Sequence, residues 1–373
     1  MATLKDWLRT HAEALDQSQD QADAVMPQLA AGGRFRVGVP TGLGGAGGDV
    51  RDAIRAIAEV AEQSVTAAFV YWGQRTFIEY LLRSPNAALR ERLLPALLDG
   101  GLAGATGLSN AMKFLSGMEP LQINAEVEQG GWRLDGQLAW VTNLHPAHFV
   151  VAAAVAPSDG APPVIVVFDS ETAGVRRGAN LELIALRGSH TAAVKLARVA
   201  AGPEQVVSAD AASWLPQVRP AFLGMQCGMS IGLARASLAQ AAGVAGSGRG
   251  PLCERIAAAR LALDQQVETL LDGVATGRFV GHPAEMFRLR IALAGSVQEA
   301  LMLELQARGG LAYLEQHQQG FGRRWRESAF IPVITPSLTQ LQAALAKQAA
   351  EQAAEQATDR AAERATARAA GQA

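Results

Sequence analysis

Residues 134–143 read LDGQLAWVTN, and they lie in a region whose pattern decides the fold class. Between residues 103 and 204 the chain contains short apolar or alternating runs, at 122–127, 132–134, 149–154, 163–168 and 193–199. Turn residues separate these runs, among them Asp135-Gly136 and Gly202-Pro203. Short runs of this kind, bounded by turn residues, indicate an antiparallel β domain.

The pattern changes to helical spacing on both sides of this β domain. Residues 1–102 carry apolar side chains three and four positions apart and end on a helix stop at Asp99-Gly100-Gly101. Helical spacing resumes in residues 205–348 and predicts a bundle of long helices. Residues 349–373 contain almost no large apolar residue, which predicts an exposed helical tail. The expected fold is therefore α+β and mostly α, with helices, then β, then helices.

Composition excludes several classes of function. With 373 residues, 49% of them hydrophobic, the chain can build the cores of two or three domains. A net charge of -2 gives no basic surface for nucleic acid. The two cysteines, Cys227 and Cys253, form no CxxC motif, so we expect neither a disulfide framework nor a metal site. Without an apolar leader or a long apolar run, a cytoplasmic protein without a membrane span is expected.

The glycine-rich run at residues 38–48 has two interpretations. Backbone N–H groups of such a run can bind phosphate. Here no GK[ST] sequence follows the run and no clear strand precedes it. These observations favour a tight connection between helices over a phosphate-binding loop.

A second informative stretch is residues 326–339, RESAFIPVITPSLT, which follows the run QARGGLAY at residues 306–313. Together they are similar to the C-terminal signature of acyl-CoA dehydrogenases. Further matches occur in the family's order at residues 38–47, 84–100, 134–143 and 186–191, so the resemblance covers about residues 30–345. It implies an N-terminal helical domain, a middle antiparallel β domain and a C-terminal four-helix bundle. It also implies oxidation of an acyl-CoA-like substrate with FAD as hydride acceptor.

The resemblance further implies which residues contact the flavin. Trp140 and Thr142 match the family residues that flank the flavin ring, while Leu108 and Ser109 match those at its pyrimidine edge. A tryptophan alone favours a buried core position, but within WVTN we expect the flavin role. The other implied cofactor contacts are Gln306, Gly309, Gly310, Ser337 and Thr339. In the family, the glutamine and the glycine pair bind the flavin pyrophosphate across a subunit interface.

The shared flavin site implies a homodimer or homotetramer. The chain departs from the family at residues 245–251, where AGSGRGP replaces a run that gives an arginine to the neighbouring flavin. Arg249 is the candidate substitute in this chain. FAD is therefore the expected cofactor, with FMN as an alternative. The expected partners are a small acyl-CoA-like substrate and an electron acceptor or flavin reductase.

The usual proton acceptor of the family is missing. In many members a glutamate in the C-terminal turn removes the α-proton of the substrate, and that position falls on Thr335. A threonine cannot act as a carboxylate base. Other relatives place the glutamate on the first bundle helix, where this chain has Gln217 and Val218 before Arg219, the candidate substrate-binding residue.

Other residues could replace the base. The candidates are His145, His148, His190, Glu304 and Glu327. Each also has a structural interpretation, such as solvated turn histidines or an ion pair of Glu327 with Arg324 or Arg326.

These observations leave functions of different classes open. One is a dehydrogenase with a relocated base, and another is a flavin monooxygenase, which needs no glutamate at this turn. A third is a member that binds flavin, acyl-CoA or a partner protein without turnover. Reduction of the flavin by acyl-CoA, oxygen consumption with a flavin reductase, or binding alone would distinguish them.

Overall fold

The first hundred residues form helices, as their apolar spacing predicts. The computed structural model describes residues 3–115, 117, 119–244, 250–317 and 320–370. Thr3 and Asp49 close capping boxes at the starts of two helices and satisfy backbone N–H groups that the helices leave free. The helices are α1 (Leu4–Gln17), α2 (Ala22–Ala31), α3 (Val50–Ala61), α4 (Val65–Arg83) and α5 (Ala87–Leu98).

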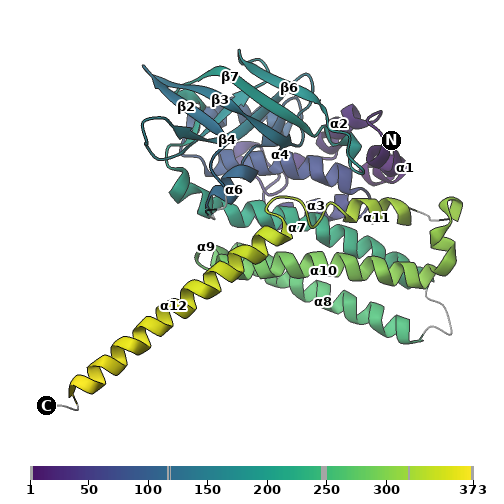
Figure 1. Cartoon of the computed structure of the whole chain (residues 1–373). Helices are drawn as coiled ribbons and strands as arrows, with labels where there is room; N and C mark the ends of the chain where they lie inside the picture. Colours follow the sequence, from purple (N-terminus) through teal and green to yellow (C-terminus); the bar gives the residue numbers. More distant parts are fainter. Residues whose placement is uncertain (1–2, 116, 118, 245–249, 318–319, 371–373) are drawn as a thin grey trace.

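Helix α4 is the central element of the molecule. Every residue from Val65 to Leu81 is buried, because α4 lies between the sheet on one side and α7 (Ala211–Val244) on the other (Figure 1). The buried polar side chains of Gln74, Arg75 and Glu79 on this helix form hydrogen bonds inside the protein, as the burial of polar groups requires. Trp72 of α4 also donates from its indole nitrogen to the carbonyl oxygen of Phe222 in α7, at 3.2 Å.

The glycine-rich run is a tight connection that leads into α3. Val39 and Gly47 form a β-bridge across it, and Gly38 has a φ of +71°. The buried guanidinium of Arg75 donates to the carbonyl oxygens of Val37, at 3.1 Å, and Gly38, at 2.8 Å. The backbone of this run is thus tied to α4, as the interpretation of a structural connection requires.

The middle of the chain forms an eight-stranded sheet. The order is β6-β7-β3-β2-β4-β5-β8, and β1 pairs with β4. The strands are β1 (Ala103–Thr106), β2 (Ile123–Glu128), β3 (Gly131–Val141), β4 (Phe149–Pro157), β5 (Val164–Asp169), β6 (Val175–Asn180), β7 (Ala192–Ala201) and β8 (Val206–Ser208). A short helix, α6 (Ser109–Leu115), follows β1.

The sheet is mixed, which corrects the expectation of purely antiparallel strands. Strand β4 pairs in parallel with β1 and, over residues 124–125, with β2. Strand β1 reaches the sheet directly from α5 and runs in the direction of β4. The remaining pairs, β2–β3, β3–β7, β6–β7, β4–β5 and β5–β8, are antiparallel.

The C-terminal block is helical again. Long helices α7, α8 (Gly250–Ala275) and α10 (Pro283–Arg308) pack together, with short helices α9 (Arg278–Gly281) and α11 (Phe321–Ser328) beside them (Figure 1). Helix α12 (Leu338–Ala370) contacts α10 near its start and then projects away from the body. No helix in the described part of the chain is long and apolar enough to cross a membrane.

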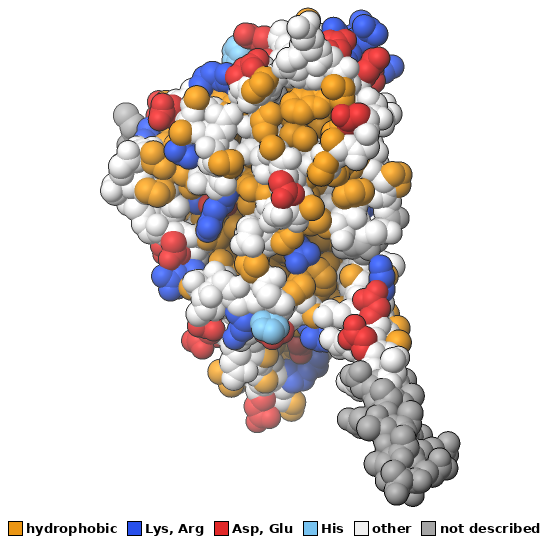
Figure 2. Space-filling view, turned by 90° about the vertical axis from the view of Figure 1, so that its left-hand side faces the viewer, with side chains coloured by type: hydrophobic (Ala, Val, Ile, Leu, Met, Phe, Trp, Pro, Cys, Tyr) orange, Lys and Arg blue, Asp and Glu red, His pale blue; other side chains and the backbone are white. Residues whose placement is uncertain are grey.

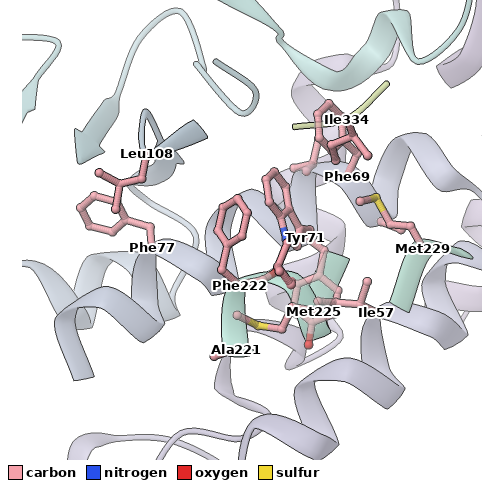
Figure 3. Close-up of a cluster of buried hydrophobic side chains, with 14 of the residues drawn as sticks. Ile57, Phe69, Tyr71, Phe77, Leu108, Ala221, Phe222, Met225, Met229 and Ile334 are labelled. Atoms are coloured by element: carbon pink, nitrogen blue, oxygen red, sulfur yellow. The ribbon is translucent and has the colours of Figure 1, made fainter. Parts of the chain in front are cut away.

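Close packing joins the bundle to the N-terminal helices. A Cβ atom on Gly232 of α7 would lie 2.2 Å from the carbonyl oxygen of Ala58 in α3, so only glycine permits this approach. Figure 3 shows side chains of α3, α4 and α7 in one apolar cluster, including Ile57, Phe69 and Met225. Ile334, from the turn before α12, lies in the same cluster. The turn before α12 is therefore packed against the apolar core through Ile334.

Candidate functional site

A cavity of about 590 Å³ lies between the β domain and the C-terminal helices. Its floor is aromatic, from Phe69 and Trp72 of α4 and Phe330 after α11. One side is formed by β3, the loop at residues 183–186 and Thr191, and the other by the segment at residues 326–340. A mostly apolar cavity with a few polar groups is the usual form of a small-molecule site.

Trp140 stands on the β3 side of the cavity, with 65% of its surface exposed. Between Leu138 and Val141 the register of β3 against β7 shifts by one residue, which is a β-bulge. A bulge redirects side chains, and here it leaves both Ala139 and Trp140 exposed. The structure thus excludes a buried-core role for Trp140.

Thr142 follows Trp140 and is held rigidly. Its hydroxyl lies 2.9 Å from the hydroxyl of Thr191 and donates to the carbonyl oxygen of Ser189 at 3.3 Å. Ser189 and Thr191 belong to the turn at residues 186–191, whose sequence resembles the family's motif, and that turn lies directly against the end of β3. The two motifs, far apart in sequence, therefore meet at one wall of the cavity.

The backbone at this wall is unusual. Asn143, Leu186 and His190 all have φ between +49° and +60°, a region that side-chain-bearing residues rarely adopt. The buried amide of Asn143 donates to the carbonyl oxygen of Gly104, at 2.9 Å, and to the side chain of Gln74, at 3.0 Å. These bonds compensate the strain and attach the end of β3 to β1 and α4.

Ser109 begins α6, and Leu108 directly precedes it. Leu108 is fully buried, and its backbone N–H donates to the hydroxyl of Thr106 at 3.3 Å. Ser109 lines the cavity beside Thr106 and Gly107. Of the expected pyrimidine contacts, only Ser109 therefore contributes a side chain to the cavity.

The opposite wall is the turn that includes Thr335. Val333, Ile334, Thr335 and Ser337 line the cavity there. The carbonyl oxygen of Thr335 accepts a hydrogen bond from Gln226 of α7 at 3.0 Å. No carboxylate is present in this turn, so the position of the family's base faces the cavity with a threonine.

Among the described residues, three charged side chains line the cavity, and each is paired. Lys113 and Glu119 form an ion pair at 3.2 Å. Arg326 binds Asp16 at 2.8 Å and also Glu13, both in α1. The sequence does not predict that Lys113, Glu119 and Arg326 line the cavity, because they belong to no motif. Only their position in the folded chain identifies them.

Several residues expected at the site lie elsewhere in the single chain. Arg219 does not line the cavity, and its guanidinium lies over the ring of Phe287, 5.5 Å from the centroid. Gln306 is exposed and accepts a hydrogen bond from Arg255. The remaining such residues, Gly309, Gly310 and Thr339, also do not line it. Arg249 lies outside the described residues.

The glutamate candidates for a base are committed to buried ion pairs. Glu304 binds Arg324 and, at 3.0 Å, Arg308. Glu327 binds Arg323 at 2.6 Å and accepts the backbone N–H of Val65 at 2.9 Å. The expected ion pair with Arg324 or Arg326 is therefore wrong, because Arg323 takes that place. The helical spacing of four residues places Arg323 on the same face as Glu327. Burial raises the pKa of Glu327, and Arg323 opposes that shift. Neither glutamate lines the cavity.

The histidine candidates also lie outside the cavity. His148 is exposed, whereas the Nε2 atoms of His190 and His145 lie 2.9 Å and 3.5 Å from one carboxylate oxygen of Asp23. Burial lowers the pKa of both, that of His190 to about 4. At neutral pH both imidazoles are therefore neutral.

Asp23, His145 and His190 have the composition of a metal site, but hydrogen bonding argues against one. Nδ1 of His145 accepts the N–H of Ala147 at 3.3 Å, so the proton of this ring is on Nε2. Nδ1 of His190 is buried without a partner in the described structure, and leaving an acceptor unpaired there costs less than leaving a donor. Both Nε2–H groups then donate to Asp23 and offer no lone pair to a metal.

Comparison with known proteins finds similarity to acyl-CoA dehydrogenases in sequence and in fold. Residues 2–101 match the model of the acyl-CoA dehydrogenase N-terminal domain. Isovaleryl-CoA dehydrogenase from Arabidopsis thaliana is 29% identical over 196 residues, which is 50% of this chain and 47% of that protein. The chain thus spans about half the length of the curated relatives it matches.

Solved structures share the fold over nearly the whole chain. A glutaryl-coenzyme A dehydrogenase in complex with glutaryl-CoA superposes with a TM-score of 0.77 and 16% identity, over 92% of this chain and 93% of that one. A protein named KijD3, in complex with FMN and an amino-keto sugar nucleotide, gives 0.76 and 19% identity, over 93% and 91%. Residues 2–101 thus match the N-terminal domain of the acyl-CoA dehydrogenases, and the chain as a whole shares the fold of these solved structures.

Proposed function

We propose that this chain is a flavin-dependent oxidoreductase whose cavity holds a flavin ring against Trp140 and Thr142. The observation that carries the proposal is the exposed face of Trp140 on the wall of an apolar cavity, next to the buried Thr142 hydroxyl. The exposed indole of Trp140 offers a flat apolar face to a ring that enters the cavity, and aromatic rings pack favourably against one another. FAD is the proposed cofactor, and FMN is the alternative.

The residues present fit the ring of a flavin. The aromatic and aliphatic lining suits a flat heterocycle, while Ser109, Thr142 and Thr191 offer hydroxyls for its polar edge. When bound, a flavin accepts a hydride or activates oxygen. The chain's own part is to exclude water with Phe69, Trp72 and Phe330 and to orient the substrate against the ring.

The substrate we propose is an acyl-CoA-like compound, oxidised between its α- and β-carbons. The match to isovaleryl-CoA dehydrogenase and the fold shared with a glutaryl-coenzyme A dehydrogenase support this class. Because Thr335 cannot accept the α-proton, a base must come from elsewhere. Glu119 is the only carboxylate among the described residues that line the cavity.

A flavin monooxygenase is the second candidate. Two observations favour it: Thr335 replaces the glutamate that only the dehydrogenase reaction needs, and the FMN complex of KijD3 shares the fold. Oxygenation at a flavin requires no carboxylate in this turn. Such an enzyme would draw electrons from a flavin reductase.

The location of the glycine pair supports a shared site in a homodimer or homotetramer. Gln306, Gly309 and Gly310 lie at the end of α10, outside the cavity of their own chain. A second copy could bring them to the pyrophosphate of a flavin, as the resemblance implies. Gly310 has open space around it, so a phosphate could approach its backbone closely.

An anaerobic titration and a separate aerobic assay of oxygen consumption together distinguish these functions. Purified protein loaded with FAD is mixed with short, medium and long acyl-CoA esters while its visible spectrum is recorded. Loss of the oxidised flavin band supports the dehydrogenase. A stable yellow protein that consumes oxygen with a flavin reductase supports the monooxygenase, and one that does neither is a binding protein. A protein that takes up neither FAD nor FMN contradicts the proposed function.

A further inference from the structure

Beneath the Thr335 turn lies a buried cation, Arg290 of α10, of which only 3% is exposed. One of its terminal nitrogens donates to the carbonyl oxygen of Ile334 at 3.0 Å. Its Nε donates to the side chain of Gln226, whose own amide donates to the carbonyl oxygen of Thr335. Arg290 and Gln226 thus hold two consecutive carbonyls of the cavity wall.

Arg290 differs from the other buried arginines in having no carboxylate partner within the described ranges. Arg75 pairs with Glu79, Arg323 with Glu327 and Arg324 with Glu304. The second terminal nitrogen of Arg290 is buried and has no hydrogen-bond partner among the described residues. Burying an unpaired charge is strongly unfavourable, so folds seldom retain one without compensation.

Cys227, the neighbour of Gln226, does not supply a negative charge. Complete burial raises the pKa of its thiol to about 12, although Arg290 opposes the shift. The thiol is therefore neutral at physiological pH. Burial also lowers the pKa of Arg290, but a guanidinium remains charged at neutral pH. The positive charge beneath the turn is thus not neutralised by a residue of the described chain.

The charge lies close to the cavity. Ile334, whose carbonyl oxygen Arg290 binds, and Thr335, whose carbonyl oxygen Gln226 binds, both line it. In a water-poor interior the field of a charge is weakly screened. A negative charge that develops in the cavity next to this turn would therefore be stabilised.

We infer that Arg290 and Gln226 are positioning residues that fix the Thr335 turn and favour the electron-rich, anionic state of whatever the cavity binds there. This inference rests on the proposed function, because a bound flavin gains negative charge when it is reduced. It predicts that neutralising Arg290 makes the bound flavin harder to reduce. Arg290 supplies its field through the turn and need not touch the flavin.

The test measures the midpoint reduction potential of the bound flavin in FAD-loaded full-length protein. Gln226→Glu places a carboxylate against Arg290 and neutralises the charge while leaving its bond to Ile334. Arg290→Met removes the charge altogether. Gln226→Met is the first control, because it loses the hydrogen bond to Thr335, as Gln226→Glu does, without a change of charge. Arg288→Met is the second control and removes an exposed cation from the same helix.

The expected result is a more negative potential in Gln226→Glu and Arg290→Met, a clearly smaller shift in Gln226→Met, and the wild-type value in Arg288→Met. Equal shifts in Gln226→Glu and Gln226→Met would show that Arg290 and Gln226 only hold the turn in place and that their charge has no effect on the flavin. That result would overturn the inference. The same holds if no variant changes the potential. These results leave the proposed function intact, whereas a wild-type protein that binds no flavin contradicts both. If Arg290→Met does not fold, Gln226→Glu decides.

Discussion

At the scale of single residues, Trp140 shows what the sequence can and cannot tell. The WVTN motif predicts a strand end with a tryptophan, but the same letters suit a buried core. The bulge in β3 decides between them, because it turns Trp140 out to the cavity at 65% exposure. A bulge depends on pairing with the distant strand β7, which local sequence does not reveal.

Replacing Trp140 tests its contact with the flavin. We expect Trp140→Ala to weaken FAD binding by about 1–3 kcal/mol, the range of aromatic contacts with burial, and to change stability little because the side chain is exposed. Fluorescence titration of the flavin-free protein measures the affinity. Trp325→Ala, at an exposed tryptophan that does not line the cavity, is the matched control. Equal affinity of both variants would remove Trp140 from the site.

His190 predicts a pH dependence of stability. Burial lowers its pKa from 6.5 to about 4, so the unfolded chain binds more protons between these values. The contribution of His190 to the free energy of unfolding is therefore fully present above pH 6.5. It falls by about 3 kcal/mol as the pH decreases to 4. Denaturant unfolding at several pH values measures the decline. His190→Gln should make it shallower, and an unchanged slope would contradict the assignment.

At the scale of elements, spacing predicted the strands with long apolar runs and missed β1, β6 and β8. Strand β1, AGAT, is buried on both faces and shows no alternation. Strand β6, VRRGAN, is too polar to stand out, and β8 has three residues. These strands form because longer neighbours pair with them, so tertiary context and not local pattern creates them.

A substitution in helix α11 tests whether Glu327 has a structural role in the fold and not a catalytic one. This buried carboxylate pairs with Arg323 and accepts the N–H of Val65 at the start of α4. Glu327→Gln leaves Arg323 buried without an anion, which we expect to cost about 3–5 kcal/mol of unfolding free energy. Chemical denaturation measures it against Glu315→Gln, at an exposed site. A stable variant that loses only catalytic rate would instead make Glu327 a base.

At the scale of the whole molecule, the three-block architecture follows from the sequence, but the site does so only in part. Trp140, Thr142, Ser109, Ser337 and Thr335 line one cavity, and their contacts with a flavin or substrate stay a prediction. Gln306 and the glycine pair lie outside it, because one chain cannot show what a second copy would contribute. Figure 2 shows charges of both signs interspersed with hydrophobic groups on one face, in line with a chain of net charge -2 and not with a basic surface.

Gly310 tests the shared site. A Cβ atom here would meet nothing within 4 Å among the described residues, so we expect Gly310→Leu to fold with an unchanged thermal midpoint. If a second copy brings its flavin to this position, the variant should bind FAD at least tenfold more weakly or lose the dimer, because the leucine blocks the approach. Light scattering and FAD titration measure both. Gly295→Leu, also in open space on α10, is the control, and identical behaviour would contradict a shared site.

The most direct test of the central claim is an equilibrium titration of flavin-free protein with FAD, followed by the visible absorption of the flavin. The account predicts saturable binding of one FAD per chain, with a shifted flavin spectrum that reports a ring transferred from water to an apolar site next to Trp140. Absence of saturable binding of FAD, and of FMN in a parallel titration, would contradict it.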